Sequence, residues 1–347
     1  MKFGLMFFGS EAMGQQPYQF LLETARLADQ SGLCAIWIPE RHFHNFGGLF
    51  PSPAVVGAAL AAVTSHIRIR AGSLVAPLHD VIQIVEEFAV VDALSQGRVD
   101  VSFASGWHPN DFIIRPANYL NRRQITHALV EETRRVWRGE SVVRPNAEGQ
   151  PVSVRLYPQP CQPELPIWLT AAANPNTFRA AGKLGANVLT HVVGQDLETL
   201  YGNVAAYRAT RVEAGHGPAD GIVTVMLHTF IADDIETVVR VARAPFKRYM
   251  EHWMDLEQAA RAVGNPAAPR LSDFSDDLIE QLHESTFRKY MNGLSLMGTL
   301  DHCRDLVARL EAHGINEIAC LVDFGIAHQT ILEGIQYLVK LARPDNS

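Results

Sequence analysis

Short apolar segments alternate with longer amphipathic segments along most of the chain. The apolar segments are rich in β-branched and aromatic residues, which is typical of buried strands. Eight of them predict strands, at 2–8, 34–40, 67–75, 99–105, 166–172, 187–192, 221–232 and 317–324.

The intervening segments have the period of amphipathic helices. In 16–32 one face carries Phe20, Leu21, Thr24, Ala25 and Ala28. Glycine, a common helix terminator, ends this segment and also the helical segments 81–97, 176–185 and 302–314.

Strands that are apolar on both faces and joined by helices indicate a parallel sheet covered on both sides. Eight such units favour a closed (β/α)8 TIM barrel over an open doubly wound sheet. We expect one domain over residues 1–347. This length is common for a single α/β barrel.

Two long excursions interrupt the alternation. Residues 106–165, after strand four, contain a helix at about 121–138 and a probable hairpin. Residues 245–298, after strand seven, contain two helices around a proline-rich turn. Long excursions in a barrel tend to be functional, so the second is expected to act as a lid.

The composition of the chain excludes several classes of function. The chain has 47% hydrophobic residues and a formal net charge of -7, with no basic region for nucleic acid. Its four cysteines are widely spaced and form no CxxC pair, which favours reduced thiols in the cytoplasm. No apolar run reaches the roughly 18 residues of a membrane helix. Glu11 interrupts the first apolar run, so we interpret that run as a strand and not as a signal peptide.

The active site of such a barrel lies at the carboxyl ends of the strands. Polar side chains follow nearly every predicted strand. The residues at strands two to five are Glu40, Arg41, His42 and His44 after strand two, Ser73 at strand three, Ser105, Gly106, His108 and Asp111 after strand four, and Asn174 and Thr177 after strand five. The last three strands end at or near His191, His228 and Asp323, respectively.

Each candidate also has a structural interpretation. Glu40 and Arg41 can form an ion pair, and isolated histidines such as His191 and His228 are often structural. Asn174 can simply cap a helix, although a helix N-terminus also attracts phosphate.

A metal-dependent barrel hydrolase is an alternative. His42, His44, His191, His228 and Asp323 can be assigned to its ligand positions. Such a histidine pair normally closes the first strand, and strand four offers no bridging carboxylate or lysine. GxGxxG and GxxxxGK[ST] motifs are absent, so Rossmann and P-loop chemistry are unsupported.

Several runs together resemble the bacterial luciferase-like, flavin-dependent monooxygenases. They are MKFGLMFFG, IWIPERHFHNFGGLFPSPAV, the run from IRIRAGSLV to SFASGWHPNDF, and PIWLTAAANPNTFRAAGKLGANVLTH, in family order over about 1–195. LSQGRVDVSFASGW is the most specific. The resemblance is nearest to the subgroup associated with nonribosomal peptide and polyketide biosynthesis.

The resemblance implies a site for FMN. Ser105 and Gly106 should lie along the flavin, Ser73 behind its isoalloxazine ring, and Asn174 with Thr177 at its phosphate. We also expect His191 to be one of the residues that bind the cofactor.

Glu40, Arg41 and His42 are the candidate catalytic residues, with His42 as proton donor or acceptor. Luciferase has a catalytic histidine where this chain has Arg41, and a reactive cysteine where it has Ala104. These departures argue against light emission.

We expect a substrate pocket of Phe8, Trp107, His108 and Asp111. Further apolar walls are expected from Phe7, Trp37, Phe103 and Trp168. Such walls exclude water, which protects the reaction of reduced flavin with dioxygen.

The predicted function is a monooxygenase that takes reduced FMN from a separate flavin reductase, uses dioxygen, and hydroxylates a small or carrier-bound metabolite. A homodimer is expected from the resemblance. The alternatives are a deazaflavin-dependent, hydride-transferring oxidoreductase of the same fold and a flavin-binding barrel without catalysis.

Overall fold

A closed barrel of parallel strands forms the centre of the molecule. The computed structural model describes residues 1–9, 16–217, 220–264 and 273–342. The barrel strands, in order, are β1 (Lys2–Met6), β2 (Ala35–Ile38), β3 (Arg68–Val75), β4 (Val99–Ala104), β7 (Ile167–Ala171), β8 (Asn187–His191), β9 (Val223–Ile231) and β11 (Glu317–Leu321). Pairing of β8 with β9 and of β11 with β1 closes the ring. The predicted barrel and its eight strands are confirmed.

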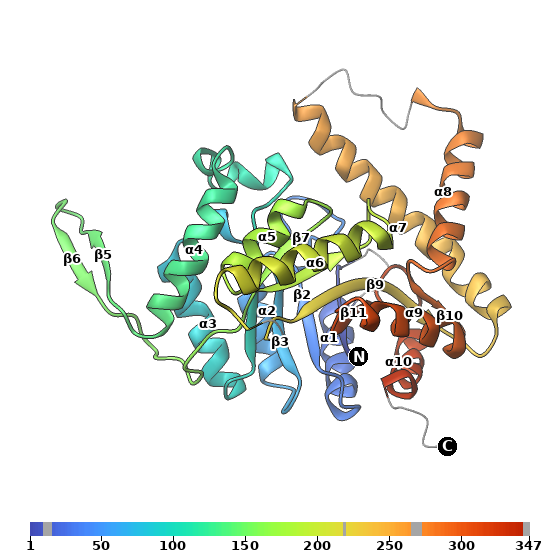
Figure 1. Cartoon of the computed structure of the whole chain (residues 1–347), viewed down its shortest axis with the longest axis horizontal. Helices are drawn as coiled ribbons and strands as arrows, with labels where there is room; N and C mark the ends of the chain where they lie inside the picture. The colour runs from blue at the N-terminus through green and yellow to red at the C-terminus, as the bar shows by residue number, and fades with distance from the viewer. Residues whose placement is uncertain (10–15, 218–219, 265–272, 343–347) are drawn as a thin grey trace.

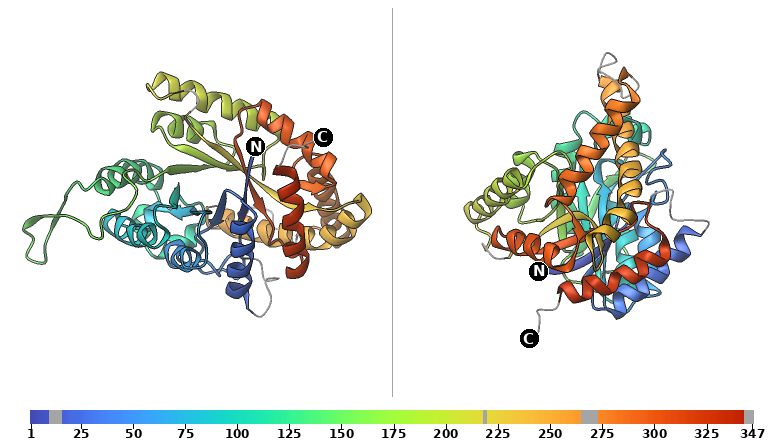
Figure 2. Two further views of the ribbon diagram at one scale, coloured as in Figure 1. Left: turned by 90° about the horizontal axis from the view of Figure 1, so that it is seen from below. Right: turned by 90° about the vertical axis from the view of Figure 1, so that its right-hand side faces the viewer.

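Helices surround the barrel (Figures 1 and 2). They are α1 (Pro17–Gln30), α2 (Pro53–Ala61), α3 (Val81–Ser95), α4 (Arg122–Trp137), α5 (Pro175–Lys183), α6 (Leu197–Glu213), α9 (Leu300–Ala312) and α10 (His328–Ala342). The buried face of α1 is the predicted one, from Phe20 to Ala28. Gly32, just past its end, has a left-handed φ of 76°, as expected of a helix terminator.

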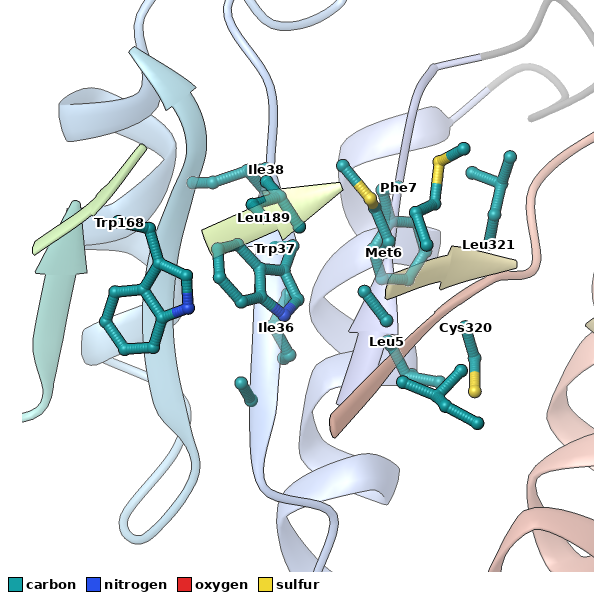
Figure 3. Close-up of a cluster of buried hydrophobic side chains, with 14 of the residues drawn as sticks. Leu5, Met6, Phe7, Ile36, Trp37, Ile38, Trp168, Leu189, Cys320 and Leu321 are labelled. Atoms are coloured by element: carbon teal, nitrogen blue, oxygen red, sulfur yellow. The ribbon is translucent and has the colours of Figure 1, made fainter. Parts of the chain in front are cut away.

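The barrel interior is filled by layers of side chains. The indole rings of Trp37 and Trp168 meet edge to face with centroids 5.6 Å apart (Figure 3). A Cβ atom at Gly72 would lie 2.6 Å from the Trp37 ring. The interior therefore has room only for glycine at this point of β3.

The excursion after β4 contains the short 3₁₀ helices at Pro109–Ile113 and Pro116–Asn118, then α4 and the predicted hairpin. The hairpin pairs β5 (Val142–Pro145) with β6 (Pro151–Val154) in antiparallel register. It extends away from the barrel (Figure 1).

The excursion after β9 consists of α7 (Ile235–Gly264) and α8 (Asp276–Met291), which pack side by side (Figure 1). Helix α7 begins earlier than the expected boundary at 245 and contains Pro245 in its interior. The short strand β10 (Leu296–Gly298), which pairs with the end of β9, was not predicted. Most of the expected proline-rich turn lies outside the described residues.

The four cysteines form no disulfide. In the described ranges, no helix is both long and apolar enough to cross a membrane.

Helix α6 offers a test of the fold. Gly202 is exposed in its interior, and a Cβ added there would meet no atom within 4 Å. We expect Gly202→Ala to raise the free energy of unfolding by about 0.5–1 kcal/mol in chemical denaturation, because alanine favours helix. Gly182→Ala in α5 is the matched control and should destabilise, because its Cβ would lie 2.6 Å from the Tyr207 carbonyl oxygen. A loss of stability in Gly202→Ala would contradict this packing.

Candidate active site

The Glu40 carboxylate is the hub of the loops after β2 and β3. Its Oε1 accepts hydrogen bonds from Nε2 of His42 and Nε2 of His79, both at 2.8 Å. Its Oε2 accepts from the backbone N–H of Val75 at 2.6 Å. Burial raises the pKa of Glu40, but these hydrogen bonds outweigh it and leave the pKa below its ordinary value. For His79 the effects have the opposite sign. Burial lowers its pKa, but the hydrogen bond to Glu40 and the charge of that carboxylate outweigh burial and raise the pKa above its ordinary value.

The structural alternative of an ion pair between Glu40 and Arg41 is therefore not observed, because two histidines and a backbone N–H bind the carboxylate. His79 was missed by the sequence reasoning. The feature of the sequence that could have identified His79 is its position in the loop after strand three, directly before Asp80, which caps helix α3.

Arg41 is a buried cation with aromatic neighbours. The residue is 6% exposed, and no hydrogen bond or ion pair joins its guanidinium to another described residue. Its Cζ lies 5.0 Å from the Phe8 ring centroid and 5.3 Å from that of Trp107. Burial lowers the pKa of Arg41, while Asp111 and Tyr249 act in the opposite direction. We call the end of the barrel at which the carboxyl ends of the strands lie the mouth. Cation–π contacts thus hold the Arg41 side chain at the mouth.

His44, His108 and Asp111 gather beside Arg41. One nitrogen or oxygen atom from each lies within 4.8 Å of the others. His44 Nε2, His108 Nε2 and Asp111 Oδ1 are buried without a hydrogen-bond partner among the described residues. Burial, with smaller contributions from His44 and Arg41, lowers the pKa of His108 to about 4. Burial raises the pKa of Asp111 to about 6, against the opposing effect of Arg41.

The expected flavin contacts follow β3 and β4. The Ser73 hydroxyl hydrogen-bonds to that of Thr170, which also bonds to Ser102 Oγ at 2.7 Å. The Gly72–Ser73 peptide is cis, and the pairing of β3 with β4 is irregular there. Ser105 and Gly106 are half-buried, and Gly106 has a left-handed φ of 72°.

Asn174 caps helix α5, so the structural interpretation of this residue is confirmed. Its Oδ1 accepts from the N–H of Asn176 at 3.0 Å, and its carbonyl accepts from the N–H of Thr177 at 3.1 Å. Thr177 is half-buried in the first turn of the helix.

His191, the last residue of β8, and His228, in the second half of β9, are neutral side chains. Desolvation lowers the pKa of His191 to about 4 and that of His228 to about 3. The ring of His228 lies among aromatic side chains, with centroid distances of 4.8–5.6 Å to Phe246, Tyr249, Tyr290 and Phe324.

The five ligands of the metal-hydrolase alternative do not come together. Asp323 accepts from the backbone N–H groups of Phe8 and Gly9 at 2.8 and 2.7 Å, and His42 is bonded to Glu40. Across the part of the chain that is described, the one group with metal-ligand spacing is His44, His108 and Asp111.

Helix α7 lies over the mouth. Tyr249 contacts Phe8, Phe46 and His228, with ring centroids 6.1, 5.0 and 4.8 Å apart. Neither Tyr249 nor Phe46 is predicted from the sequence, because their contacts depend on how α7 crosses the barrel.

The expected apolar walls lie in different places. Phe8 and Trp107 flank Arg41, whereas Phe7 packs against Phe20 of α1. Trp37 and Trp168 lie deeper, on the Arg70 guanidinium inside the barrel. Phe103 is buried on the strand face opposite the inward-facing Ser102.

Comparison with known proteins identifies the family to which this barrel belongs. The family model described as "Luciferase-like monooxygenase" matches residues 1–317. The chain belongs to this family. The match extends beyond the resemblance over 1–195 and covers nearly the whole barrel.

Two characterised proteins illustrate the relationship. The chain is 26% identical over 343 residues to the oxygenase component of a flavin-dependent trigonelline monooxygenase from Acinetobacter baylyi, covering 95% of this chain and 90% of that protein. It is 22% identical over 332 residues to the alkanal monooxygenase alpha chain of Photorhabdus luminescens, covering 91% and 90%.

Solved structures share the fold. The monooxygenase RslO1 from Streptomyces bottropensis superposes with a TM-score of 0.78 at 23% identity, covering 99% of this chain and 98% of that one. An F420-dependent secondary alcohol dehydrogenase superposes with a TM-score of 0.72 at 17% identity, covering 99% and 100%.

The mouth has the polar lining of a ligand site. Buried atoms without partners within the described ranges occur in several loops around it, among them His108 Nε2, Asp111 Oδ1, His191 Nδ1 and Gln195 Oε1. Buried polar groups are normally hydrogen-bonded, so unpartnered ones at a strand-end site indicate a ligand.

Asp111 gives a pH-dependent prediction. Its folded-state pKa of about 6 lies above the ordinary 3.8, so folding favours the protonated form. The penalty for its charge is absent below about pH 4 and complete above about pH 6. Asp111→Asn should therefore stabilise the protein more at pH 8 than at pH 4, by up to about 3 kcal/mol.

Thermal denaturation of both proteins at pH 4, 6 and 8 measures this difference. Asp301→Asn, on the exposed first turn of α9, controls for the loss of one negative charge. A stability difference between Asp111→Asn and wild type that stays constant with pH would contradict the raised pKa.

Proposed function

We propose that this chain is the oxygenase component of a two-component, FMN-dependent monooxygenase that hydroxylates a small or carrier-bound metabolite. The observation that carries the proposal is similarity to an oxygenase component over 95% of the chain. A separate flavin reductase would supply reduced FMN. Reduced FMN supplies two electrons to dioxygen, one oxygen atom enters the substrate, and the other leaves as water.

The loops of the barrel provide the expected contacts for FMN. Ser73, Ser105, Gly106 and His191 would lie against the flavin ring system. Asn174 and Thr177 would meet the phosphate at the N-terminus of α5, where the helix dipole favours an anion. A phosphate there would replace Asn174 Oδ1 as acceptor for the N–H of Asn176.

The catalytic assignment rests on the Glu40 hub. Glu40, held ionised by its hydrogen bonds, fixes the ring of His42 through Nε2. The other ring nitrogen of His42 is then left to exchange a proton with substrate or solvent. Phe8, Trp107 and Tyr249 of α7 surround the adjoining space and would exclude water.

A deazaflavin-dependent oxidoreductase is the second candidate, because such an enzyme has the same fold. A likeness of fold alone leaves the cofactor open, whereas the family match and the oxygenase relative favour FMN. The expected cytoplasmic location and role in nonribosomal peptide or polyketide biosynthesis remain proposals.

The homodimer also belongs to this proposal. Helices α2 and α3 pack together and expose Val55, Val90 and Leu94. Exposed apolar side chains on two helices that pack together support a subunit interface.

Labelling with oxygen-18 tests the function. The protein is mixed with reduced FMN, labelled dioxygen and a pool of small metabolites, and incorporation of label is followed by mass spectrometry. Incorporation is expected with reduced FMN. Reduction of a metabolite by reduced deazaflavin, with no labelled product from FMN, would favour the second candidate.

His42→Ala should retain FMN affinity and lose labelled product by about 10²-fold or more, the usual contribution of an acid–base group. Hydrogen peroxide release should rise correspondingly. His66→Ala, which changes an exposed histidine, is the control. Full product formation in His42→Ala would assign His42 a structural role.

The phosphate site is tested by charge. Asn174→Asp keeps a good helix cap but places a negative charge at the proposed site, and Thr177→Ala removes a hydroxyl. Each should weaken FMN binding by about 1–3 kcal/mol in titrations. Riboflavin, which lacks the phosphate, should bind these variants and wild type equally. If FMN affinity is unchanged, the phosphate lies elsewhere.

A further inference from the structure

The Arg41 side chain combines burial, charge and the lack of a described polar partner. The residue is 6% exposed, and its described contacts are the faces of Phe8 and Trp107. Burying an unpaired charge is costly. The five N–H donors of a guanidinium form a planar fork that matches a carboxylate. The guanidinium donors of Arg41 are therefore free of hydrogen bonds to described residues and can bind an anionic group.

His108 presents a second donor. Its Nδ1 accepts from the backbone N–H of Asn110 at 3.3 Å. Since a neutral imidazole carries one proton, that proton lies on Nε2. Nε2 is buried without a described partner, as is Nε2 of the adjoining His44, whose ring centroid lies 4.5 Å from that of His108.

This arrangement is unsuited to a metal ion, although His44, His108 and Asp111 have metal-ligand spacing. A metal at Nε2 of His108 would require the ring proton to move to Nδ1, which would replace its acceptance of the Asn110 N–H by a contact between two donors. The positive charge of Arg41, which adds to the effect of burial in lowering the pKa of both histidines, would also repel a divalent cation. Arg41 and Nε2–H of His108 therefore favour an anion, against the negative charge that Asp111 carries above about pH 6.

Asp111 is the acidic side chain that faces Arg41. No hydrogen bond or ion pair between them occurs among the described residues, and burial disfavours the charged form of Asp111. The guanidinium fork is thus not occupied by this carboxylate.

We propose that Arg41, His108 and His44 form a subsite for a carboxylate group of the organic substrate, with Phe8 and Trp107 against its apolar part. The proposal deepens the function proposed above, because it names the class of molecule that would be oxidised. Arg41 would bind the carboxylate through its fork, and Nε2–H of His108 would donate to one of its oxygens.

The test is calorimetric titration of protein saturated with oxidised FMN. The probes are benzoate and phenylacetate, compared with benzamide and phenylacetamide, which have similar shapes but no charge. The carboxylates should bind about tenfold or more tightly than the amides, the scale of a charge-assisted hydrogen bond.

Variants locate the site. Arg41→Met should weaken carboxylate binding by about tenfold or more without changing FMN affinity, and Arg41→Lys should weaken it less. Arg135→Met, which removes an exposed arginine in the last turn of α4, should bind as wild type does. Asp111→Asn should retain or increase carboxylate affinity, because it removes a competing negative charge.

Several results would overturn the proposal. They are equal affinity for amides and carboxylates, no binding of any probe at millimolar concentration, or unchanged carboxylate affinity in Arg41→Met. Loss of FMN affinity in Arg41→Met would assign Arg41 to the flavin. Stoichiometric zinc binding that disappears in Asp111→Asn would establish a metal site instead. If Arg41→Met does not fold, Arg41→Lys and the comparison of probes on wild type decide.

Probe binding requires no turnover. Selective carboxylate binding without oxygen-18 incorporation would therefore remove the proposed function and leave the subsite intact. Oxygen-18 incorporation without selective binding would do the reverse.

Discussion

A buried arginine inside the barrel sets the geometry on which the site depends. The Arg70 guanidinium lies between Trp37 and Trp168, with Cζ 4.8 and 4.5 Å from their ring centroids. It forms ion pairs with Asp100 and Glu317. These side chains come from β2, β3, β4, β7 and β11. Loss of one partner from such a network costs about 3–5 kcal/mol, because it leaves a buried charge unpaired. Five strands are thereby held in one mutual register.

That register decides which side chains reach the mouth. Strand residues alternate between faces, so Asp100 inside the barrel places Ser102 inside as well. Glu317 does the same for Ala319 and Leu321 of β11. Asp323, two residues past the end of this strand, anchors the loop after β1. A slip of one residue would turn each set toward the helices. The irregularity between Gly72 and Leu74 is the exception, and it lets Ser73 reach the hydroxyl of Thr170.

The elements could be predicted from sequence far better than the contacts. Strands and helix faces follow from periodicity, which is local, and all eight barrel strands were found. The partner of Glu40 depends on side-chain direction, which periodicity does not give. Arg41, its neighbour in sequence, lies instead against Phe8 and Trp107, while His79 reaches Glu40 from the next strand–helix loop. Helix α7 begins at Ile235, ten residues before the expected start of the excursion at 245, and it continues through Pro245.

The ionisable side chains at the mouth differ in whether the protein stabilises their charged form, and this difference limits which reactions the site can support. Glu40 receives three hydrogen bonds, so its charge is stabilised within the protein. His108, His191 and His228 avoid charge, since desolvation lowers each pKa to about 3–4. A dry pocket with neutral histidines suits a reaction that water would divert. Arg41 keeps its charge in the same pocket, with Phe8 and Trp107 on its faces and Asp111 as the nearby carboxylate that makes no hydrogen bond to it. An anion bound to the guanidinium fork would compensate that charge, and it would therefore fix the orientation of the molecule that carries it.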